Sequence, residues 1–264
     1  MPLPTPRIVF FDAGGTLIHP HPSVGHVYTE VAARHGIPCD PEALDVGFRT
    51  AFRQHLNRVR NNGGLAYGPT LSTARAHWGP LVRDAFLIAG GAMAEAAATA
   101  QGNLEPPGTT PFDRFFLDVF DEFAHPHRFR FEDGAAETLR ALQSRGIATG
   151  LLSNWDARLR SIIEASDIRP LLDVTIISAE AGYAKPHPGI FAAARAAAEA
   201  ALAAPIDDPA TIFLVGDSPG DDVTGAREAG WTPLLFEPVP SESNVQPPPA
   251  TVVRQLRDIV TLLQ

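Results

Sequence analysis

The sequence predicts an α/β protein whose core is a doubly wound parallel sheet, with a helical domain inserted after the first strand. After Glu132, short apolar runs alternate with segments of helix length, as they do in strand–helix–strand units. An isolated apolar run, Ile8–Phe11, stands far upstream of that alternation, and the residues between show only helical periodicity. We therefore expect a core domain formed by residues 1–18 and 130–264, and a helical domain formed by residues 19–129.

The first strand is predicted at Ile8–Phe11. Four consecutive apolar residues are typical of a parallel strand that is buried on both faces. Asp12 and two glycines follow at once, which indicates that the strand ends in a tight loop.

Helices without strands are predicted for the inserted domain. Helical periodicity covers four segments, at residues 24–35, 41–60, 72–89 and 112–123. Proline and glycine clusters separate them at residues 61–64 and 105–111. The aromatic residues of these segments are expected to form a hydrophobic core rather than a substrate site; they include Trp78, Phe86, Phe115, Phe116 and Phe120.

The rest of the core domain follows in order along the chain. Helices are predicted at residues 134–144, 157–166, 189–203 and 222–229. Strands are predicted at residues 149–153, 174–178, 211–215 and 233–236. A surface loop rich in proline and serine is predicted at residues 238–249, before a final helix at residues 250–263.

Composition excludes several classes of protein. The 21 basic and 30 acidic residues give 21 − 30 = −9, and this acidity argues against broad nucleic-acid binding. The single cysteine, Cys39, excludes an internal disulfide and a multi-cysteine zinc site. No apolar stretch is long enough to cross a membrane, and the first apolar run is too short for a signal-peptide core. We expect a cytoplasmic protein whose partner is a small molecule; the sequence does not predict its oligomeric state.

Polar residues gather where the predicted strands end. In an open parallel sheet, ligands bind beyond the carboxyl ends of the strands. The residues at or just after those ends are Asp12, Thr16, Ser153, Asn154, Lys185, Asp217, Asp221 and Asp222. They supply a carboxylate nucleophile, hydroxyls, an amide, a cation and a second acidic group.

This set of groups suits phosphoryl transfer. A carboxylate can attack phosphorus and form an acyl phosphate. Hard oxygen ligands such as Asp12 and Asp217 favour Mg²⁺, which brings two anions together. Lys185 can neutralise developing charge, and the N–H groups of the turn that contains Gly14 and Gly15 can bind an anion.

The order of these residues resembles the four motifs of the haloacid dehalogenase-like (HAD) hydrolase superfamily. The first motif is similar to Asp12 through Leu17, and the second to Leu152-Ser153-Asn154. The third is similar to Lys185-Pro186 with Gly189-Ile190-Phe191, and the fourth to Gly216 through Asp222 with Gly225-Ala226. Together these motifs cover about 150 residues, which is the scale of one domain. The resemblance implies a Rossmann-like core and a helical cap of the C1 type.

The resemblance also implies roles for single residues. Asp12 would be the nucleophile, with Ser153 and Lys185 completing the catalytic set by holding the phosphate. Phosphate contacts are further implied for Gly15, Thr16 and Asn154. A Mg²⁺ ion would be bound by Asp12, the Gly14 carbonyl, Asp217 and Asp222.

Position 14 departs from the pattern of the superfamily's phosphatases. These enzymes usually carry a second aspartate there, which protonates the leaving group and then activates water, whereas this chain has Gly14. General acid–base help is worth about 10²–10⁴ in rate, so we expect weak activity on ordinary phosphate monoesters. A substrate whose leaving group has a low pKa would not need this acid, and His19, His21 or a histidine of the helical cap could supply it instead.

Two other functions stay open at this point. A HAD-like protein without activity could use the site to bind a phosphorylated ligand or a protein. A 2-haloacid dehalogenase would use the same aspartate without metal, but retention of Gly216-Asp217 favours metal and phosphorus chemistry. Lys185 is the only lysine of the chain, which argues against a lysine-dependent phosphonatase with its lysine in residues 19–129. A chain that otherwise uses arginine and places its one lysine here suggests a role for an ammonium group.

Overall fold

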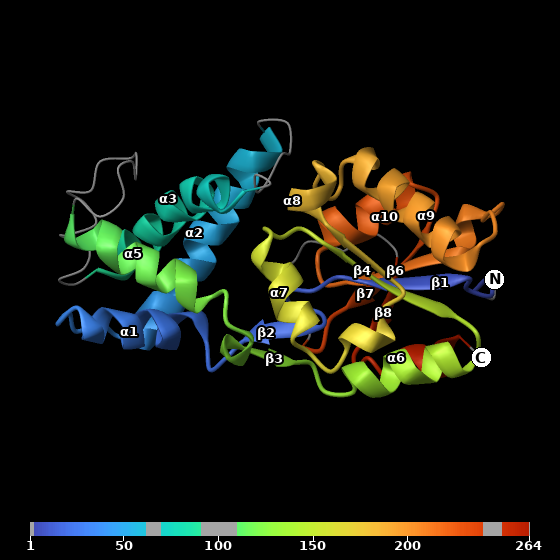
Figure 1. Ribbon diagram of the computed structural model, residues 1–264, viewed down its shortest axis with the longest axis horizontal. Helices are drawn as coiled ribbons and strands as arrows, with labels where there is room; N and C mark the ends of the chain where they lie inside the picture. The colour runs from blue at the N-terminus through green and yellow to red at the C-terminus, as the bar shows by residue number, and fades with distance from the viewer. Residues whose placement is uncertain (1–2, 62–69, 91–109, 240–249, 264) are drawn as a thin grey trace. The chain divides into compact units, whose positions relative to one another are not determined.

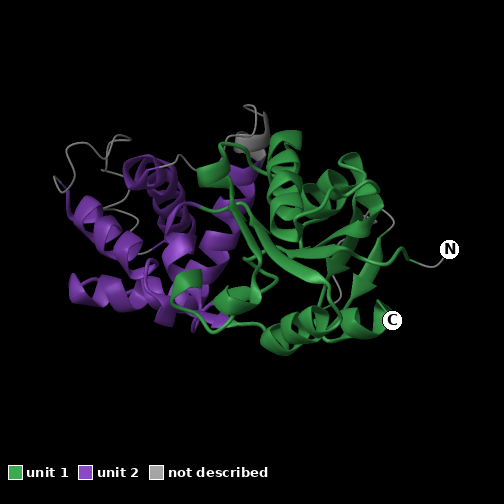
Figure 2. Ribbon diagram, turned by 45° about the vertical axis from the view of Figure 1, so that its right-hand side comes forward, with its two compact units in different colours: residues 1–19, 131–155, 163–264 green, residues 20–130, 156–162 purple. Residues whose placement is uncertain are grey.

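The computed structural model describes residues 3–61, 70–90, 110–239 and 250–263. The chain divides into two compact units, coloured separately in Figure 2. Unit 1 contains residues 1–19, 131–155 and 163–264, and unit 2 contains residues 20–130 and 156–162. Each unit is described by itself.

Unit 1 is built on a six-stranded parallel sheet in the order β5-β4-β1-β6-β7-β8. The strands are β1 (Ile8–Phe11), β4 (Ala148–Ser153), β5 (Val174–Ile177), β6 (Ile212–Gly216), β7 (Thr232–Phe236) and β8 (Thr251–Val253). All four residues of β1 are fully buried, as its continuous apolar run predicts. Because β1 pairs with β4 on one side and β6 on the other, its end lies at the centre of the sheet edge.

Helices cover both faces of this sheet, which confirms the doubly wound fold (Figure 1). Figure 1 shows α8 (Ser178–Ala181), α9 (Pro188–Leu202) and α10 (Gly225–Glu228) on one face. On the other face lies α6 (Ala135–Ser144), which α11 (Asp258–Leu262) contacts. Single helical turns are η2 (Arg169–Leu171), η3 (Pro209–Thr211) and the π-type turn η4 (Pro219–Thr224).

Three local predictions are wrong. The first part of the predicted final helix contains the strand β8, an edge strand of three residues, and only α11 is helical. The predicted helix at 222–229 begins as the π-type turn η4. Two short strands, β2 (Ile18–Pro20) and β3 (Phe129–Phe131), pair at the borders of the inserted segment, where no strand was predicted. Three residues are too few to show a periodicity of two.

Unit 2 consists mainly of helices, as predicted. They are α1 (Val24–Arg34), α2 (Pro41–Asn61), α3 (Leu71–Ala89), α5 (Pro111–Glu122) and the turn η1 (Pro126–Arg128). Ser23, Thr70 and Thr110 cap three of these helices by accepting a main-chain hydrogen bond, which satisfies a free N–H at each start. The predicted breaks at 61–64 and 105–111, and the predicted loop at 238–249, lie largely outside the described residues.

Aromatic side chains form the core of unit 2. Phe86, Phe115, Phe116 and Phe120 are almost completely buried, and Trp78 packs against the same cluster. Phe86 stacks on Tyr28 from α1 at a ring-centroid distance of 5.6 Å. These residues therefore have the structural role that their helical spacing predicts.

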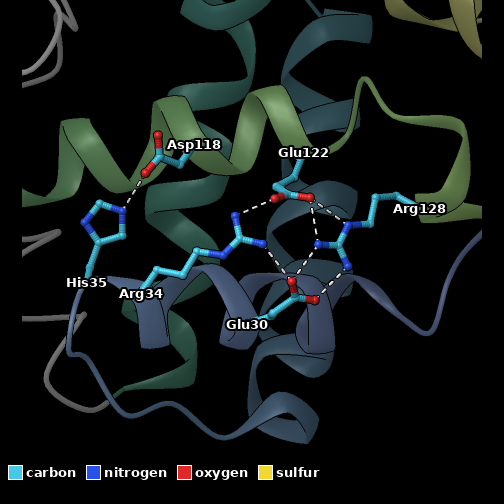
Figure 3. Close-up of polar contacts among 6 residues, drawn as sticks. All are labelled: Glu30, Arg34, His35, Asp118, Glu122 and Arg128. Carbon is cyan, nitrogen blue, oxygen red and sulfur yellow. Dashed lines mark hydrogen bonds and ion pairs between the residues drawn. The ribbon is translucent and has the colours of Figure 1, made fainter.

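An ion-pair network joins α1, α5 and η1 within unit 2 (Figure 3). Arg128 donates to both oxygens of Glu30 and to Glu122, and Arg34 donates to the same two carboxylates. The two arginines lower the pKa of Glu30 to about 2, first through hydrogen bonds and then through their charge. Figure 3 also shows His35, the residue that follows α1, reaching Asp118 on α5, so polar contacts complement the aromatic core.

One segment falls outside the domain boundaries predicted from the sequence. Residues 156–162, which we expected in the core domain, belong to unit 2. The carboxylate of Asp156 is completely buried, binds the guanidinium of Arg158 at 2.7 and 2.9 Å, and accepts a hydrogen bond from Trp78 Nε1 at 2.8 Å. Arg158 also lies 3.7 Å above the Phe120 ring. These contacts attach the first half of α7 (Arg158–Glu164) to unit 2.

Within the described residues, no helix is both long enough and apolar enough to cross a membrane.

Candidate active site

The carboxyl ends of three adjacent strands bring polar residues together in unit 1. Asp12 follows β1, Ser153 is the last residue of β4, and Asp217 follows β6. Phe11 pairs in parallel register with Val215. Asp12 is one residue beyond Phe11 and Asp217 is two residues beyond Val215, so both aspartates lie just past the ends of neighbouring strands. The sheet edge that the sequence predicts as the ligand site therefore carries the predicted residues.

Lys185 connects the nucleophile candidate to a second carboxylate. Its Nζ lies 2.7 Å from Asp12 Oδ1 and 2.6 Å from Asp222 Oδ1, and all three side chains are buried. The other oxygen of Asp222, Oδ2, accepts a hydrogen bond from the Ser218 N–H at 2.9 Å, which fixes this carboxylate as well. The ammonium group thus fixes the direction of the Asp12 carboxylate.

Three carboxylates surround one point of this site. Asp12, Asp217 and Asp222 each offer an oxygen, and these oxygens all lie within 4.8 Å of one another. Three ionised carboxylates and one ammonium give a formal charge of −3 + 1 = −2. The donor set, hard oxygens with an excess of two negative charges, fits a divalent cation such as Mg²⁺.

The pKa values of the site reflect crowding of like charge. Burial, and then repulsion by Asp222, raise the pKa of Asp12 to about 6, although the Lys185 ammonium opposes this shift. Lost hydration, and then repulsion by Asp12 and Asp222, raise the pKa of Asp217 to about 8. Burial opposes the charge of Lys185, but Asp12 and Asp222 raise its pKa above the ordinary value, so the amine stays protonated.

Two glycines allow the carboxylates to come this close. Gly15 has a φ of +80°, and a Cβ there would lie 2.3 Å from Asp217 Oδ2. A Cβ on Gly216 would lie 2.2 Å from Asp222 Oδ2. Any larger residue at either position would displace a predicted metal ligand.

Asn154 and Ser153 hold the reacting groups in place. Both amide atoms of Asn154 are used on the main chain of Lys185: Nδ2 donates to the carbonyl at 2.9 Å, and Oδ1 accepts the N–H at 2.7 Å. Asn154 therefore positions the lysine, and its predicted contact with phosphate stays a prediction. Ser153 is buried, and its hydroxyl hydrogen bonds to the Asp12 carboxylate.

The remaining predicted residues lie in the loop after Asp12. Thr16 is fully buried, and its hydroxyl has no hydrogen-bond partner among the described residues, so it can still bind a ligand oxygen. Gly15 lies against Asp217 in this loop. The phosphate contacts predicted for Gly15 and Thr16, and metal binding by the Gly14 carbonyl, stay predictions.

Sequence reasoning missed Trp155 as a residue of this site. Its main-chain N–H donates to Ser178 Oγ at 3.0 Å, and its carbonyl accepts from the same hydroxyl at 3.1 Å. The ring lies next to Gly14, with Cζ3 at 3.0 Å from the place of a Cβ. The sequence did contain a signal for this role of Trp155. A large aromatic residue directly follows Ser153-Asn154, and position 14 is a glycine.

The two histidines considered as alternative acids have different surroundings. His19 Nε2 lies 2.7 Å from Glu132 Oε2, so this imidazole already has a carboxylate partner within unit 1. His21 is exposed and belongs to unit 2.

Comparison with known proteins agrees with this geometry. Residues 6–230 match the family model described as a hydrolase, haloacid dehalogenase-like hydrolase. The chain is similar to human haloacid dehalogenase-like hydrolase domain-containing protein 3, with 31% identity over 229 residues, which are 87% of this chain and 81% of the human protein.

Solved structures share the fold at lower identity. The HAD-hydrolase YfnB from Bacillus subtilis, crystallised with magnesium, superposes with a TM-score of 0.69 at 17% identity and covers 98% of this chain and 99% of its own. The L-2-haloacid dehalogenase from Xanthobacter autotrophicus reaches a TM-score of 0.64 at 18% identity and covers 98% of each chain. At such identity the two structures support the fold and do not distinguish between phosphatase and dehalogenase chemistry.

Proposed function

This chain belongs to the haloacid dehalogenase-like hydrolase family, and from that premise we propose that it is a Mg²⁺-dependent, phosphatase-type hydrolase of a small phosphorylated metabolite. One observation carries the proposal: Asp12, Asp217 and Asp222 converge on one point while the Lys185 ammonium binds two of them. A protein that served only as a structural unit would gain nothing from placing Asp12 and Asp217 where burial and repulsion by neighbouring carboxylates raise their pKa values.

Asp12 performs the covalent step in this proposal. A carboxylate oxygen of Asp12 attacks phosphorus, the bond from phosphorus to the leaving-group oxygen breaks, and an aspartyl phosphate forms. Water then attacks the phosphorus of that acyl phosphate, which releases inorganic phosphate and restores the carboxylate. Lys185 holds the attacking carboxylate in place and offsets the charge that develops on the phosphoryl oxygens.

Asp12, Asp217 and Asp222, with the Gly14 carbonyl, are the residues that would hold Mg²⁺. The bound ion would supply the positive charge that lets an anionic substrate approach an anionic nucleophile. We also propose that unit 2 acts as the cap that excludes water during the reaction, because it is inserted in the chain directly after the loop that carries Asp12.

A screen for phosphate release tests the proposal. We expect the full-length protein with Mg²⁺ to release inorganic phosphate from at least one small phosphorylated metabolite, and to favour compounds whose leaving group is a weak base. Halide release from a 2-haloacid in the presence of a chelator would instead identify a dehalogenase. Binding of phosphate analogues without any turnover would identify a non-catalytic binding protein.

The pH dependence of stability gives a prediction that needs no substrate. The native pKa values of Asp12 and Asp217, about 6 and about 8, exceed the ordinary value of 3.8, so the folded state binds these protons more tightly than the unfolded state. Below pH 3.8 this contribution to stability is fully present, and it is lost as the pH rises to about 8. We expect the melting temperature in chelator to fall between pH 6 and pH 9.

Mg²⁺ should restore the melting temperature that is lost at high pH. The bound ion would replace the protons of Asp12 and Asp217 and compensate the negative charge of the carboxylates. Titration calorimetry in two buffers of different ionisation enthalpy should show proton release on binding, largest near neutral pH and small above pH 9. The variant Asp217→Asn provides the control, since it removes the group whose pKa is about 8. Stability in chelator that rises from pH 6 to pH 9, or Mg²⁺ affinity independent of pH, would contradict the prediction.

A further inference from the structure

The loop that carries the proposed nucleophile contains a glycine that its backbone does not require. Gly15 has a positive φ, which favours glycine. The φ of Gly14 lies outside the left-handed region, so its φ does not itself require glycine. Gly14 is also only half-buried. The reason for glycine at this position must therefore lie in a neighbouring side chain.

That neighbour is the indole of Trp155. A Cβ on Gly14 would lie 3.0 Å from Cζ3, 3.7 Å from Cε3 and 3.9 Å from Cη2. An atom above the ring face would be nearly equidistant from these three carbons, so this pattern places the Cβ beyond the edge of the ring. Even alanine requires the indole to shift by a few tenths of an ångström, and a longer side chain would meet the ring edge directly.

The main chain of Trp155 has little freedom to retreat. Its N–H and carbonyl are both bonded to the hydroxyl of Ser178, which is buried, and the carbonyl also accepts the Ala179 N–H. The next residue, Asp156, is completely buried and held by Arg158. Only a rotation of the indole itself could open the space beside Gly14.

We propose that Trp155 is a specificity-determining residue: it occupies the space of a side chain at position 14 and restricts the enzyme to phosphoryl substrates whose leaving group departs as a stable anion. This inference rests on the proposed phosphatase-type function and names its substrate class, acyl and aryl phosphates. The indole lies against the space that a carboxylic acid at position 14 would need in order to protonate the departing oxygen. A leaving group that is a weak base needs no such proton, whereas an alkoxide does.

A series of substrates tests this without any variant. The wild-type protein with Mg²⁺ should hydrolyse acetyl phosphate and 4-nitrophenyl phosphate, phenyl phosphate more slowly, and ethyl phosphate about 10²–10⁴-fold more slowly in kcat/KM, the scale of a missing general acid. Similar rates along the series would overturn the inference while leaving the proposed function intact. If none of these compounds is hydrolysed and the screen of phosphorylated metabolites also gives no phosphate release, the proposed function itself is overturned.

Four variants distinguish the effect of adding a carboxylic acid at position 14 from the effect of removing the indole beside it. Gly14→Asp alone and Trp155→Ala alone should not increase activity on ethyl phosphate. The double variant Gly14→Asp/Trp155→Ala should raise ethyl phosphate hydrolysis about 10²–10⁴-fold above Trp155→Ala and flatten the dependence on leaving group. The matched control, Gly14→Asn/Trp155→Ala, has the same volume without an acid and should show no gain.

A merely structural role of Trp155 would not flatten the dependence on leaving group. Circular dichroism and thermal melts show which variants are folded, and only folded variants enter the comparison. If Gly14→Asp alone gives the full gain, or if the asparagine control matches the aspartate variant, the inference is overturned.

Discussion

Replacing Asp12 by asparagine is expected to abolish phosphate release while leaving the protein folded. The amide cannot attack phosphorus, and loss of the nucleophile in covalent catalysis costs about 10⁴-fold or more. The introduced amide would still offer its oxygen to the Lys185 ammonium, and Asp222 would still neutralise that charge. The loss of activity should therefore not follow from unfolding.

The Asp12→Asn substitution should also change the thermal stability of the protein. Because the pKa of Asp12 is raised to about 6, the carboxylate that predominates at pH 7.5 is less favourable in the folded protein than in the unfolded chain. A neutral amide relieves the repulsion with Asp217 and Asp222, so the melting temperature in chelator should be equal to or higher than that of the wild type. Mg²⁺ should then stabilise the variant less than the wild type, since one ligand charge is missing.

Chemical trapping connects the kinetics to the intermediate. A quenched reaction of the wild type should carry an acyl phosphate on the peptide that contains Asp12, and the variant should carry none. Residual activity of the variant within tenfold of the wild type would show that Asp12 is not the nucleophile. In that case the proposed covalent mechanism is wrong, whatever the metal dependence of the reaction.

The sequence predicts the centre of the sheet and its edge well, for a physical reason. A parallel strand buried on both faces must be apolar throughout, so β1 is visible as Ile8–Phe11 without any alignment. The polar residues that follow such strands must lie at one edge, and Asp12, Lys185 and Asp222 are in direct contact there. Chain order and strand polarity were enough to predict this convergence.

Features that depend on contacts between distant residues were not predictable in this way. The bond of Trp155 to Ser178 and the contact of its ring with Gly14 join positions whose separation in the chain has no periodic signature. The role of Asn154 also differs from expectation, because both of its amide atoms are engaged by the Lys185 main chain. Residues 156–162 join unit 2 through the buried pair of Asp156 and Arg158, which hydropathy does not show.

Lys185→Met is expected to destabilise the protein more than any other single change at this site. The ammonium is almost completely buried between Asp12 and Asp222, and a methionine of similar length removes the charge without leaving a large cavity. Removing one partner of a buried ion pair costs about 3–5 kcal/mol, because the other charges stay buried without compensation. For a protein of this size that corresponds to a fall of roughly 6–20 °C in melting temperature.

The loss should depend on pH in a direction that identifies its cause. Without the lysine, the native pKa values of Asp12 and Asp217 rise further, so the folded variant holds protons still more tightly than the unfolded chain. The difference between wild type and variant is then smallest near pH 5, where the carboxylates protonate, and largest at pH 8 to 9. Mg²⁺ should restore part of the stability, since it supplies positive charge at the same point.

Thermal melts of wild type, Lys185→Met and Lys185→Arg from pH 5 to pH 9, each with chelator and with Mg²⁺, measure these effects. The arginine variant keeps the charge, but the planar guanidinium cannot repeat the two short contacts of the Nζ atom, so it should recover stability more than activity. A Lys185→Met variant as stable as the wild type at pH 8 in chelator would show that the carboxylates do not need this charge. The electrostatic basis of the candidate site would then be wrong, because the buried carboxylates would not depend on the Lys185 ammonium to compensate their charge.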